Sequence, residues 1–502
     1  MATRLRRISQ IVCFILFAWL LVRTKMFDSE GVGMRLAYPN LFSKLDPLAA
    51  LVNALAGHAL YAGLAWSLII LIPTFFLGRF FCGWICPLGS LNHFLSGIRS
   101  ESKRCKTLIA SNRYKKWQTA KYFVLMAGLL AAICRSSIVG WIDPLTLFLR
   151  SAGISILPAA ASKKFYIVYQ PHYWFYVMMG VAFLALLAMN LRVTRFWCRA
   201  LCPLGALLGM ATRWSILGLH KNAATCNKCS QCLVGCQGGD DPIGGVPWRK
   251  AECHLCLNCV AACPHGCLQF RFFHQGPEVV GTSLPRRRAL AAMATGLAAA
   301  PMLHAQTARG KSRNERLIRP PGALDETDFL SQCIRCGECV RVCPNNALQP
   351  TFAEAGLEGL WSPVVTPKIG YCEPKCMLCS EVCPTGAIRE LTVPQKGWVA
   401  GDGAPSRPVR LGTAVYDREH CMPWARATEC LVCEEWCPAE PKAIYFENAQ
   451  VMDREGNTRT LKRPHVDPNR CVGCGACEFA CPLRERPAVY VVSLGESRLS
   501  HH

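Results

Sequence analysis

The chain has 502 residues, of which 51% are hydrophobic and 18% are charged, with 32 cysteines and a formal net charge of +23. The low charged fraction argues against a disordered or wholly soluble chain, and the length allows two to four domains. Residues 1–315 hold 35 Lys/Arg against 10 Asp/Glu, whereas residues 316–502 hold 21 against 23. The excess positive charge therefore belongs entirely to the first part of the chain.

Four apolar runs in that first part predict membrane helices, with flanking residues completing the shorter ones. The runs are Ile8–Val22, Ala59–Leu77, Tyr122–Cys134 and Phe175–Leu191. Lys and Arg concentrate before the first run, between the second and third, and after the fourth. The positive-inside rule then places both ends of a four-helix bundle in the cytoplasm. Because no aromatic–basic nucleic-acid module is present, we expect a multi-pass protein of the bacterial inner membrane with no nucleic-acid partner.

A repeat follows the second and fourth runs. Residues 79–91 match residues 195–207, and each copy contains Cys-x3-Cys-Pro-Leu-Gly. Its thiols are the candidate catalytic residues: Cys82, Cys86, Cys198 and Cys202. They would act as two dithiol/disulfide pairs or as one metal or cluster site, with neighbouring arginines lowering the thiol pKa. The alternative is that they are small buried residues at tight helix ends.

Twenty-four further cysteines form six arrays of four. Two arrays lie in residues 221–280: Cys226, Cys229, Cys232, Cys236 and Cys253, Cys256, Cys259, Cys263. Four lie in residues 316–502: Cys333, Cys336, Cys339, Cys343; Cys372, Cys376, Cys379, Cys383; Cys421, Cys430, Cys433, Cys437; and Cys471, Cys474, Cys477, Cys481. The spacing follows the C-x2-C-x2-C-x3-C-P run of bacterial ferredoxins, and zinc would not require it. We predict about six 4Fe–4S clusters, two in residues 221–280 and four in residues 316–502, bound through the iron by these cysteines.

In a ferredoxin run the fourth cysteine ligates the neighbouring cluster. Crossed ligation therefore predicts that Cys263 completes the first site of residues 221–280 and Cys236 the second, whereas the pairing in residues 316–502 stays open. Two arrays are widened, between Cys372 and Cys376 and before Cys430, so a vacant or three-iron site is an alternative there. Four cysteines without a partner pattern are expected to be structural: Cys13, Cys105, Cys134 and Cys267.

Residues 281–315 contain three arginines before a short apolar run, Ala289–Leu303. This segment is either a linker with a buried helix or an embedded twin-arginine-like signal that exports the C-terminal part of the chain. His58 and His172, at the predicted outer face, are weaker candidates for a quinol or haem site. No Cys-x-x-Cys-His motif occurs, so c-type haem is excluded.

The expected fold is multi-domain. An α-helical membrane bundle of four helices, or five with Ala289–Leu303, is joined to two α+β bacterial-ferredoxin-like polycluster domains. The expected domains are a membrane domain, a two-cluster module on the cytoplasmic side, the linker or signal, and a four-cluster domain on the periplasmic side: residues 1–220, 221–280, 281–315 and 316–502.

The motifs resemble two known families. Residues 1–280, with two Cys-x3-Cys-Pro-Leu-Gly motifs and a two-cluster module, resemble NapH-type ferredoxin membrane proteins. Residues 285–502, opening on Cys333-Ile-Arg-Cys-Gly-Glu-Cys-Val-Arg-Val-Cys-Pro344, resemble NapG-type and MauM-type periplasmic ferredoxins. The resemblance implies a NapH–NapG fusion and a quinol dehydrogenase component. It would pass electrons from the quinone pool through the clusters to a periplasmic cytochrome or reductase.

Two other functions stay open at this point. MauM/MauN-type relatives suggest a maturation factor that supplies electrons for assembling the cofactor of another enzyme. The repeat cysteines would also suit a copper-reducing assembly protein.

Overall fold

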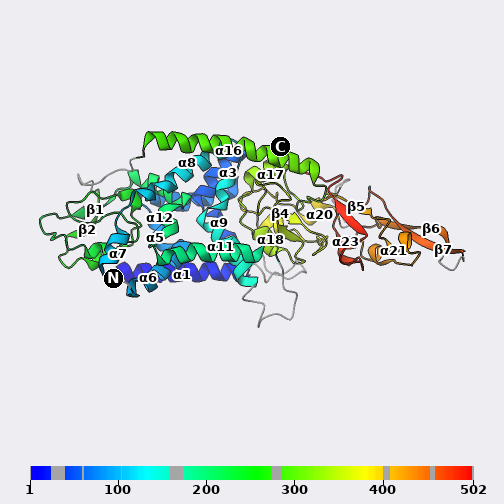
Figure 1. The fold of residues 1–502 in the computed structure, drawn as a ribbon, viewed down its shortest axis with the longest axis horizontal. Helices are drawn as coiled ribbons and strands as arrows, with labels where there is room; N and C mark the ends of the chain where they lie inside the picture. The colour runs from blue at the N-terminus through cyan, green and yellow to red at the C-terminus, as the bar shows by residue number, and fades with distance from the viewer. Residues whose placement is uncertain are drawn as a thin grey trace. The chain divides into compact units, whose positions relative to one another are not determined.

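The computed structural model describes residues 2–23, 40–58, 61–102, 105–158, 173, 175–273, 284–398, 408–452 and 458–499. These residues form two compact units, coloured from blue to green and from green to red in Figure 1. Unit 1 contains the N-terminal helix, Asn40–Ile156 and Tyr176–Met302, and unit 2 is built on Leu303–His502.

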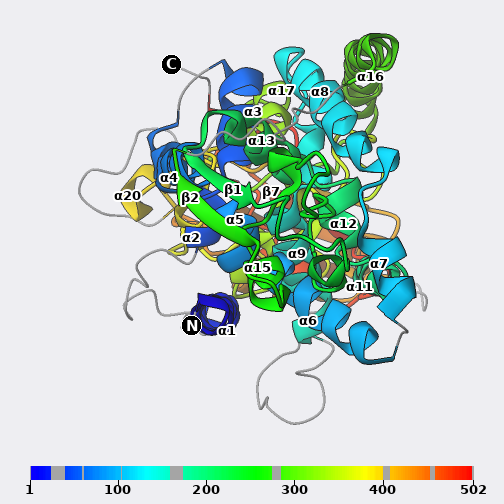
Figure 2. The same cartoon turned by 90° about the vertical axis from the view of Figure 1, so that its left-hand side faces the viewer.

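Unit 1 is mainly helical. Its α-helices are α1 (Ala2–Arg23), α2 (Leu41–Lys44), α3 (Pro47–Gly57), α4 (Leu68–Leu77), α5 (Phe80–Trp84), α6 (Pro87–Ser102), α7 (Cys105–Asn112), α8 (Ala120–Ile133), α9 (Pro144–Arg150), α11 (Tyr176–Ala188), α12 (Phe196–Ala200), α13 (Pro203–Ala211), α14 (Gln231–Val234) and α15 (Asn258–Ala262). Strands β1 (Leu217–Lys221) and β2 (Leu268–Phe272) pair antiparallel, and the cysteines of the two-cluster module lie in the chain between them. Helix α16 (Arg286–Arg313) begins in this unit, and Figure 2 shows α16 and α1 end-on at opposite margins of it.

Two Asp-Pro pairs begin equivalent helices in the two halves of unit 1. Asp46 caps α3 and accepts hydrogen bonds from its first turn, including one of 2.8 Å from the N–H of Leu48. Asp143 caps α9 in the same way, with 2.9 Å from the N–H of Thr146. A proline at the first helical position suits this geometry, since its missing N–H would have no partner there. The repeat seen at the cysteines therefore extends to helix starts far upstream of them.

The predicted four-helix membrane bundle is wrong. Among the described residues only α1 is long and apolar enough to cross a membrane, over Ala2–Val22. The second run begins as a 3-10 helix, Ala62–Ser67, and continues as α4, which contains Pro73. The third and fourth runs form α-helices of 14 and 13 residues. At 1.5 Å per residue these fall short of a hydrocarbon core of roughly 30 Å, so a multi-pass location is not supported.

The fifth run is also not a membrane helix by this measure. Ala289–Leu303 lies within the 28 residues of α16, which carries arginines at both ends. The hydropathy of a run counts apolar content, but it does not detect where a helix stops or changes type.

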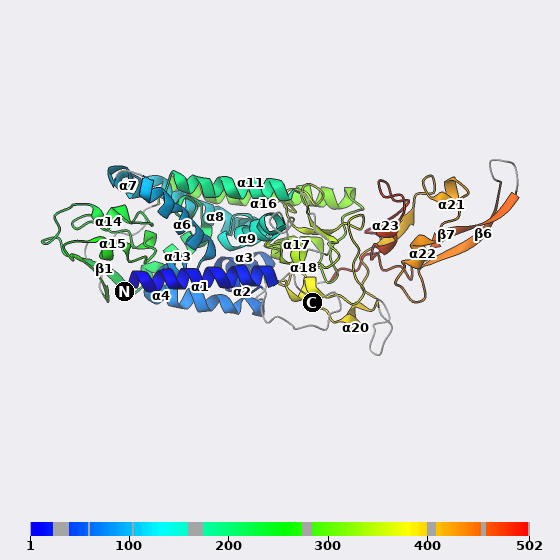
Figure 3. The same ribbon diagram turned by 90° about the horizontal axis from the view of Figure 1, so that it is seen from below.

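Unit 2 consists of short helices and two-stranded sheets around cysteine-rich loops. Its helices are α17 (Glu326–Gln332), α18 (Glu338–Val342), α19 (Leu378–Glu381), α20 (Val393–Lys396), α21 (Met422–Ala425), α22 (Val432–Glu435) and α23 (Ala476–Ala480). Its strands pair antiparallel as β3 (Leu348–Pro350) with β4 (Pro363–Val365), β5 (Thr413–Tyr416) with β8 (Val489–Val492), and β6 (Ile444–Met452) with β7 (Thr458–Val466). Figure 3 shows the β6–β7 hairpin projecting from its unit. The α+β character predicted for the ferredoxin part is present.

Candidate metal-cluster sites

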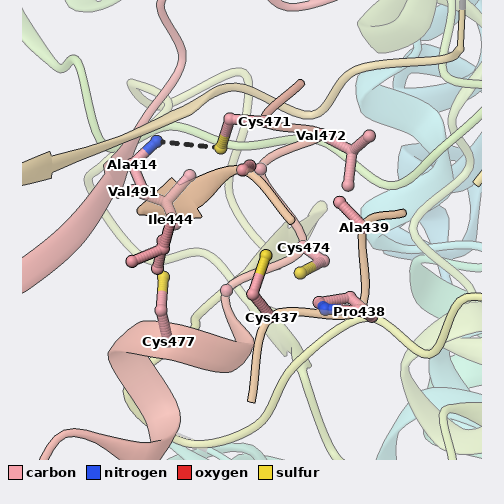
Figure 4. Close-up of a pocket in the computed structure, with 13 residues that line it drawn as sticks. Ala414, Cys437, Pro438, Ala439, Ile444, Cys471, Val472, Cys474, Cys477 and Val491 are labelled. Atoms are coloured by element: carbon pink, nitrogen blue, oxygen red, sulfur yellow. Dashed lines mark hydrogen bonds between the residues drawn. The ribbon is translucent and has the colours of Figure 1, made fainter. Parts of the chain in front are cut away.

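In unit 2, cysteines from different arrays meet in shared cavities. Figure 4 shows the cavity lined by Cys437, Cys471, Cys474 and Cys477. The N–H of Ala414 donates a 3.4 Å hydrogen bond to Cys471 Sγ. Three of these thiols come from the last array, and Cys437 comes from the array before it.

The reciprocal cavity is lined by Cys421, Cys430, Cys433 and Cys481. The hydroxyl of Tyr416 lies 3.1 Å from Cys433 Sγ. The residues that widen the spacing after Cys421 form α21, and Cys421 still lines the same cavity as the others. The third and fourth arrays therefore exchange their last cysteines.

The first and second arrays of unit 2 are arranged in the same way. Cys343 shares a cavity with three cysteines of the next array: Cys372, Cys376 and Cys379. Lys396 Nζ reaches Cys372 Sγ at 3.6 Å. Cys383 of the second array in turn lies near the cysteines of the first. Burial raises the pKa of Cys336 and Cys339, and nearby charged groups, Cys383 among them, raise it further. In unit 2 the first array is thus paired with the second and the third array with the fourth, a pairing that the sequence left open.

In unit 1, Cys263 joins Cys226, Cys229 and Cys232 around one cavity, the grouping that crossed spacing predicts. This cavity and the three in unit 2 are similar in volume, from about 310 to about 390 Å³.

The second group of this module is buried. Cys236, Cys253 and Cys259 lie in one hydrophobic core, and Cys256 lies close enough to raise the pKa of Cys259 further, after burial. Cys236 Sγ donates to Asp240 Oδ1 at 2.8 Å. The assignment of all 24 cysteines as ligands stays a prediction, but their grouping into fours is what such ligands require.

The two halves of the repeat place their second cysteines identically. Cys86 and Cys202 each precede a helix that begins with proline. The N–H of Gly89 donates to Cys86 Sγ at 3.4 Å, and the N–H of Gly205 donates to Cys202 Sγ at 3.2 Å. Backbone donors aimed at sulfur stabilise a negatively charged ligand.

The first cysteines of the repeat complete the same buried site. Arg79 Nη2 lies 4.0 Å from Cys82 Sγ, and Asn92 Nδ2 lies 3.6 Å from Cys198 Sγ. Burial raises the pKa of Cys198, and the charge of Cys82 raises it further. Unit 1 therefore brings all four repeat cysteines together, rather than keeping two separate pairs. We name this group the repeat-cysteine site.

For three of these thiols the pKa is raised overall, so the prediction that arginines lower it is wrong for them. Burial raises the pKa of Cys86 and Cys202 well above the usual value, and neighbouring cysteines add to the effect. Arg195 lowers the pKa of Cys86 only slightly by comparison. Buried thiols of this kind stay protonated until a metal replaces the protons.

No group of three or more His, Cys, Asp or Glu side chains in the described part of the chain is arranged to bind a single metal ion. Around one zinc ion, thiolates stand only about 2.3 Å from the metal. In a cluster each thiolate binds a different iron atom, so the sulfurs stand further apart. The geometry of the repeat-cysteine site therefore fits a cluster better than a single copper or zinc ion.

The repeat-cysteine site is joined to the buried group of the two-cluster module. Trp84 Nε1 donates to the carbonyl of Leu255 at 3.0 Å, and Arg79 Nη1 donates to the carbonyl of Ala251 at 2.8 Å. A Cβ added to Gly83 would lie 2.1 Å from the carbonyl oxygen of His254, so only glycine allows this approach. The loop between Cys82 and Cys86 thus packs directly on the loop between Cys253 and Cys256.

Buried cations surround this junction: Arg6, Arg79, Lys121, Arg195 and Arg199. Glu252 forms ion pairs with Lys121 and, at 4.0 Å, with Arg79. Among the described residues, none accepts a hydrogen bond from the guanidinium of Arg6 or bonds either ring nitrogen of His254. Unpaired buried charge costs several kcal/mol, about 3–5 in measured cases. Thiolate-bound clusters are anionic, so buried cations with unpaired guanidinium nitrogens are suited to a site that holds such a cluster.

Sequence reasoning missed several of these residues. Arg6 belongs to no cysteine motif, and only the fold brings it to the junction. Glu252 and His254 flank Cys253 in the sequence, but no motif assigns them a role. The repeated Asp-Pro-Leu at residues 46–48 and 143–145 was a usable signal for the extended repeat. Of the two candidate histidines, His58 ends α3 in a left-handed conformation and His172 lies outside the described residues.

Comparison with known families agrees with iron–sulfur binding. Residues 59–105 and 174–221 match a 4Fe-4S binding domain, and these two segments contain the repeat cysteines. Residues 332–387 match a 4Fe-4S dicluster domain, and residues 462–483 match a further 4Fe-4S binding domain. The fold and these matches define an iron–sulfur electron-transfer protein of the ferredoxin type with multiple 4Fe–4S clusters.

The chain is 37% identical over 210 residues to the ferredoxin-type protein NapG of Escherichia coli K12, covering 40% of this chain and 80% of that protein. It is 36% identical over 174 residues to the methylamine utilization ferredoxin-type protein MauM of Methylorubrum extorquens, covering 34% and 69%. It is 27% identical over 217 residues to the regulatory protein NosR of Pseudomonas aeruginosa, covering 40% and 28%. No solved structure matches. The chain belongs to the NapG/MauM family of ferredoxin-type proteins, and the NapH-type resemblance of residues 1–280 stays a prediction.

Proposed function

We propose that this protein carries electrons from a membrane quinol to a periplasmic redox protein. Clusters held by the 24 array cysteines and by the repeat-cysteine site supply reversible one-electron transfer when bound. Membership of the ferredoxin-type family supports electron transfer, and the quinol donor and the periplasmic acceptor are our extension of it.

One observation carries the proposal: the repeat-cysteine site and the buried group of the two-cluster module share a packed interface. Trp84, Gly83 and His254 lie at that interface, and the carbonyl of Leu255 accepts the hydrogen bond from Trp84. Two redox centres that share a wall of protein exchange electrons without exposing either to water. At this contact the two-cluster module lies next to the repeat cysteines, a position that the sequence alone did not predict.

The residues of the interface have separate tasks. Arg195 holds the backbone at Cys82, since its Nη1 donates to the carbonyl of Cys82 at 2.9 Å, and Arg79 holds the loop before Cys253 through the carbonyl of Ala251. Their charges favour the reduced, more negative state of the site. Glu252 keeps Lys121 and Arg79 from repelling one another inside the protein.

We infer that α1 attaches the protein to a membrane. From Ile8 onward its outward side chains are apolar, with Ile8 58%, Ile15 60% and Trp19 47% exposed. Such a helix places unit 1 where a lipid-soluble quinol is available. The arginines that begin α16 support the further proposal that unit 2 is exported to the periplasm.

The test is a quinol titration. The full-length protein is purified without oxygen, its clusters are reconstituted, and it is placed in lipid vesicles. We expect a reduced quinol analogue to bleach the cluster absorbance and to produce the EPR signals of reduced 4Fe–4S clusters. If dithionite gives these signals and no quinol does, the quinol-donor proposal fails.

The similarity to MauM favours a second candidate, a redox maturation factor acting on another enzyme. Such a factor would hold the same clusters but would take its electrons from a soluble donor. In the same titration it would be reduced by a soluble reductant with the vesicles omitted and would not respond to quinol.

A further inference from the structure

Five cysteines, rather than four, line the exposed cluster site of unit 1. Cys267 belongs to the cavity formed by Cys226, Cys229, Cys232 and Cys263. Its sulfur lies 3.1 Å from that of Cys263, and Cys226 lines the same cavity. It is 7% exposed, so the sulfur points into the protein rather than to solvent.

The local backbone holds this fifth thiol in place. Gly266 has a φ of +58°, a left-handed conformation that lets the chain turn back between Cys263 and Cys267. The carbonyl of Cys267 accepts a 2.9 Å hydrogen bond from the N–H of Asn222, and β2 begins at the next residue. The sheet therefore fixes the position of Cys267 whether or not Cys263 is engaged.

The other cavities differ at this point. Cys343 is the corresponding last cysteine of its array, and the residue four positions later is Ala347, which lines the same cavity. The cavity completed by Cys481 and the one containing Cys437 are each lined by four cysteines. Among the four cavities described above, only this one has a fifth thiol, so the thiol is not a consequence of the ferredoxin spacing.

This site also has the most accessible ligand. Of the 24 predicted ligands, Cys229 alone is exposed, and Cys226 and Cys263 are partly exposed. Accessible thiolates are the ones that oxidants modify first. A buried thiol beside a partly exposed ligand can replace it without a large movement.

We propose that Cys267 is a reserve ligand of this site and binds iron when Cys263 is lost or modified. The exchange is a ligand substitution: the bond from iron to the Cys263 sulfur breaks, the bond to the Cys267 sulfur forms, and the proton of the Cys267 thiol passes to the released Cys263 sulfur 3.1 Å away. No electron is transferred. The inference rests on the proposed presence of a cluster at this site.

The test compares iron content and EPR spectra of reconstituted full-length variants. Replacement of one ligand normally leaves a three-iron cluster, a loss of about one iron atom per site, and removal of two ligands loses about four. We expect Cys263→Ala to keep the wild-type iron content and to show no three-iron signal. Cys263→Ala/Cys267→Ala should lose iron, and Cys267→Ala alone should keep its cluster. The matched control, Cys343→Ala, has Ala347 instead of a reserve thiol and should show the three-iron signal.

A three-iron signal of equal intensity in Cys263→Ala and Cys343→Ala overturns the inference. Far-UV circular dichroism and the signals of the remaining clusters show whether each variant is folded, and Cys263→Val gives a second variant that likewise has no ligand atom at this position. Failure of the underlying proposal looks different. In that case Cys226→Ala/Cys229→Ala has the iron content of the wild type, because no cluster was present.

Discussion

The indole Nε1 of Trp84 donates a 3.0 Å hydrogen bond to the carbonyl oxygen of Leu255. The first residue lies between two repeat cysteines, and the second lies between two cysteines of the module that comes after the repeat. A single hydrogen bond therefore joins the loops of two cysteine groups, although its two residues are 171 positions apart in sequence.

We predict that Trp84→Phe slows electron transfer across this junction. The ring packing is kept, but Leu255 loses its donor, and a net loss of about 1 kcal/mol in the interface is expected. A change of about 1.4 kcal/mol in a barrier is tenfold in rate, so a loss of about 1 kcal/mol should slow quinol-driven reduction of the module by about fivefold. Stopped-flow absorbance in vesicles measures this rate. Trp214→Phe, at a position 65% exposed, is the control and should leave the rate unchanged; equal rates in both variants would contradict the prediction.

Glu252→Gln should destabilise unit 1 strongly. Glu252 is buried and pairs with Lys121, and Tyr122 donates a 3.0 Å hydrogen bond to its other oxygen. Removing one partner of a buried ion pair costs about 3–5 kcal/mol because the other charge stays buried. The urea midpoint of the anaerobic protein should fall.

A matched control for that change is Asp241→Asn. Asp241 pairs with Arg249, which is partly exposed. Partly exposed pairs contribute about 0–1 kcal/mol, so this variant should unfold close to the wild-type midpoint. A fall of similar size in both variants would show that Glu252 has no special structural role.

The pairing of arrays in unit 2 can be tested by counting iron. Cys343→Ala/Cys376→Ala removes two ligands from one cavity and should lose one cluster, about four iron atoms, with no three-iron signal. Cys343→Ala/Cys336→Ala removes one ligand from each of two sites and should give three-iron signals from both. The reverse pattern would mean that each array binds its own cluster.

The buried pair Asp46 and Asp143 predicts a pH-dependent stability. Burial raises the pKa of both carboxyl groups, and the charge of Asp143 raises that of Asp46 further. Asp46 is therefore the protonated partner in the hydrogen bond between them. A raised pKa in the folded state means that this stabilisation is complete at low pH and is lost as pH rises through the folded-state pKa.

Asp46→Asn should remove this dependence. Its amide donates to Asp143 at every pH, and asparagine is as good a helix cap as aspartate. Thermal unfolding measured in steps upward from about pH 4, the ordinary pKa of an aspartate, should show the wild type losing more stability with rising pH than the variant. Parallel pH profiles would exclude the shared proton.

The sequence correctly predicted 4Fe–4S binding, because thiolate spacing is a local property. Crossed grouping within residues 221–280 followed from two arrays with only one possible partner each. In residues 316–502 four similar arrays offered several partners, and only packing selects among them. The membrane bundle was mispredicted because apolar content does not reveal that α4 starts as a 3-10 turn and contains Pro73. Arg79, Arg195 and Arg199 lie beside the repeat cysteines in the sequence, but Arg6 reaches the junction only through the fold and could not be predicted.

The proposed electron route requires that the repeat cysteines and the 24 array cysteines all hold clusters. Mössbauer spectroscopy with iron quantification on the reconstituted protein and on Cys82→Ala/Cys198→Ala tests it most directly. Seven 4Fe–4S clusters correspond to about 28 iron atoms per chain, and the double variant should hold about 24. An equal iron content in the two proteins would contradict a cluster at the repeat-cysteine site, and a wild-type content well below 24 would contradict the array assignment.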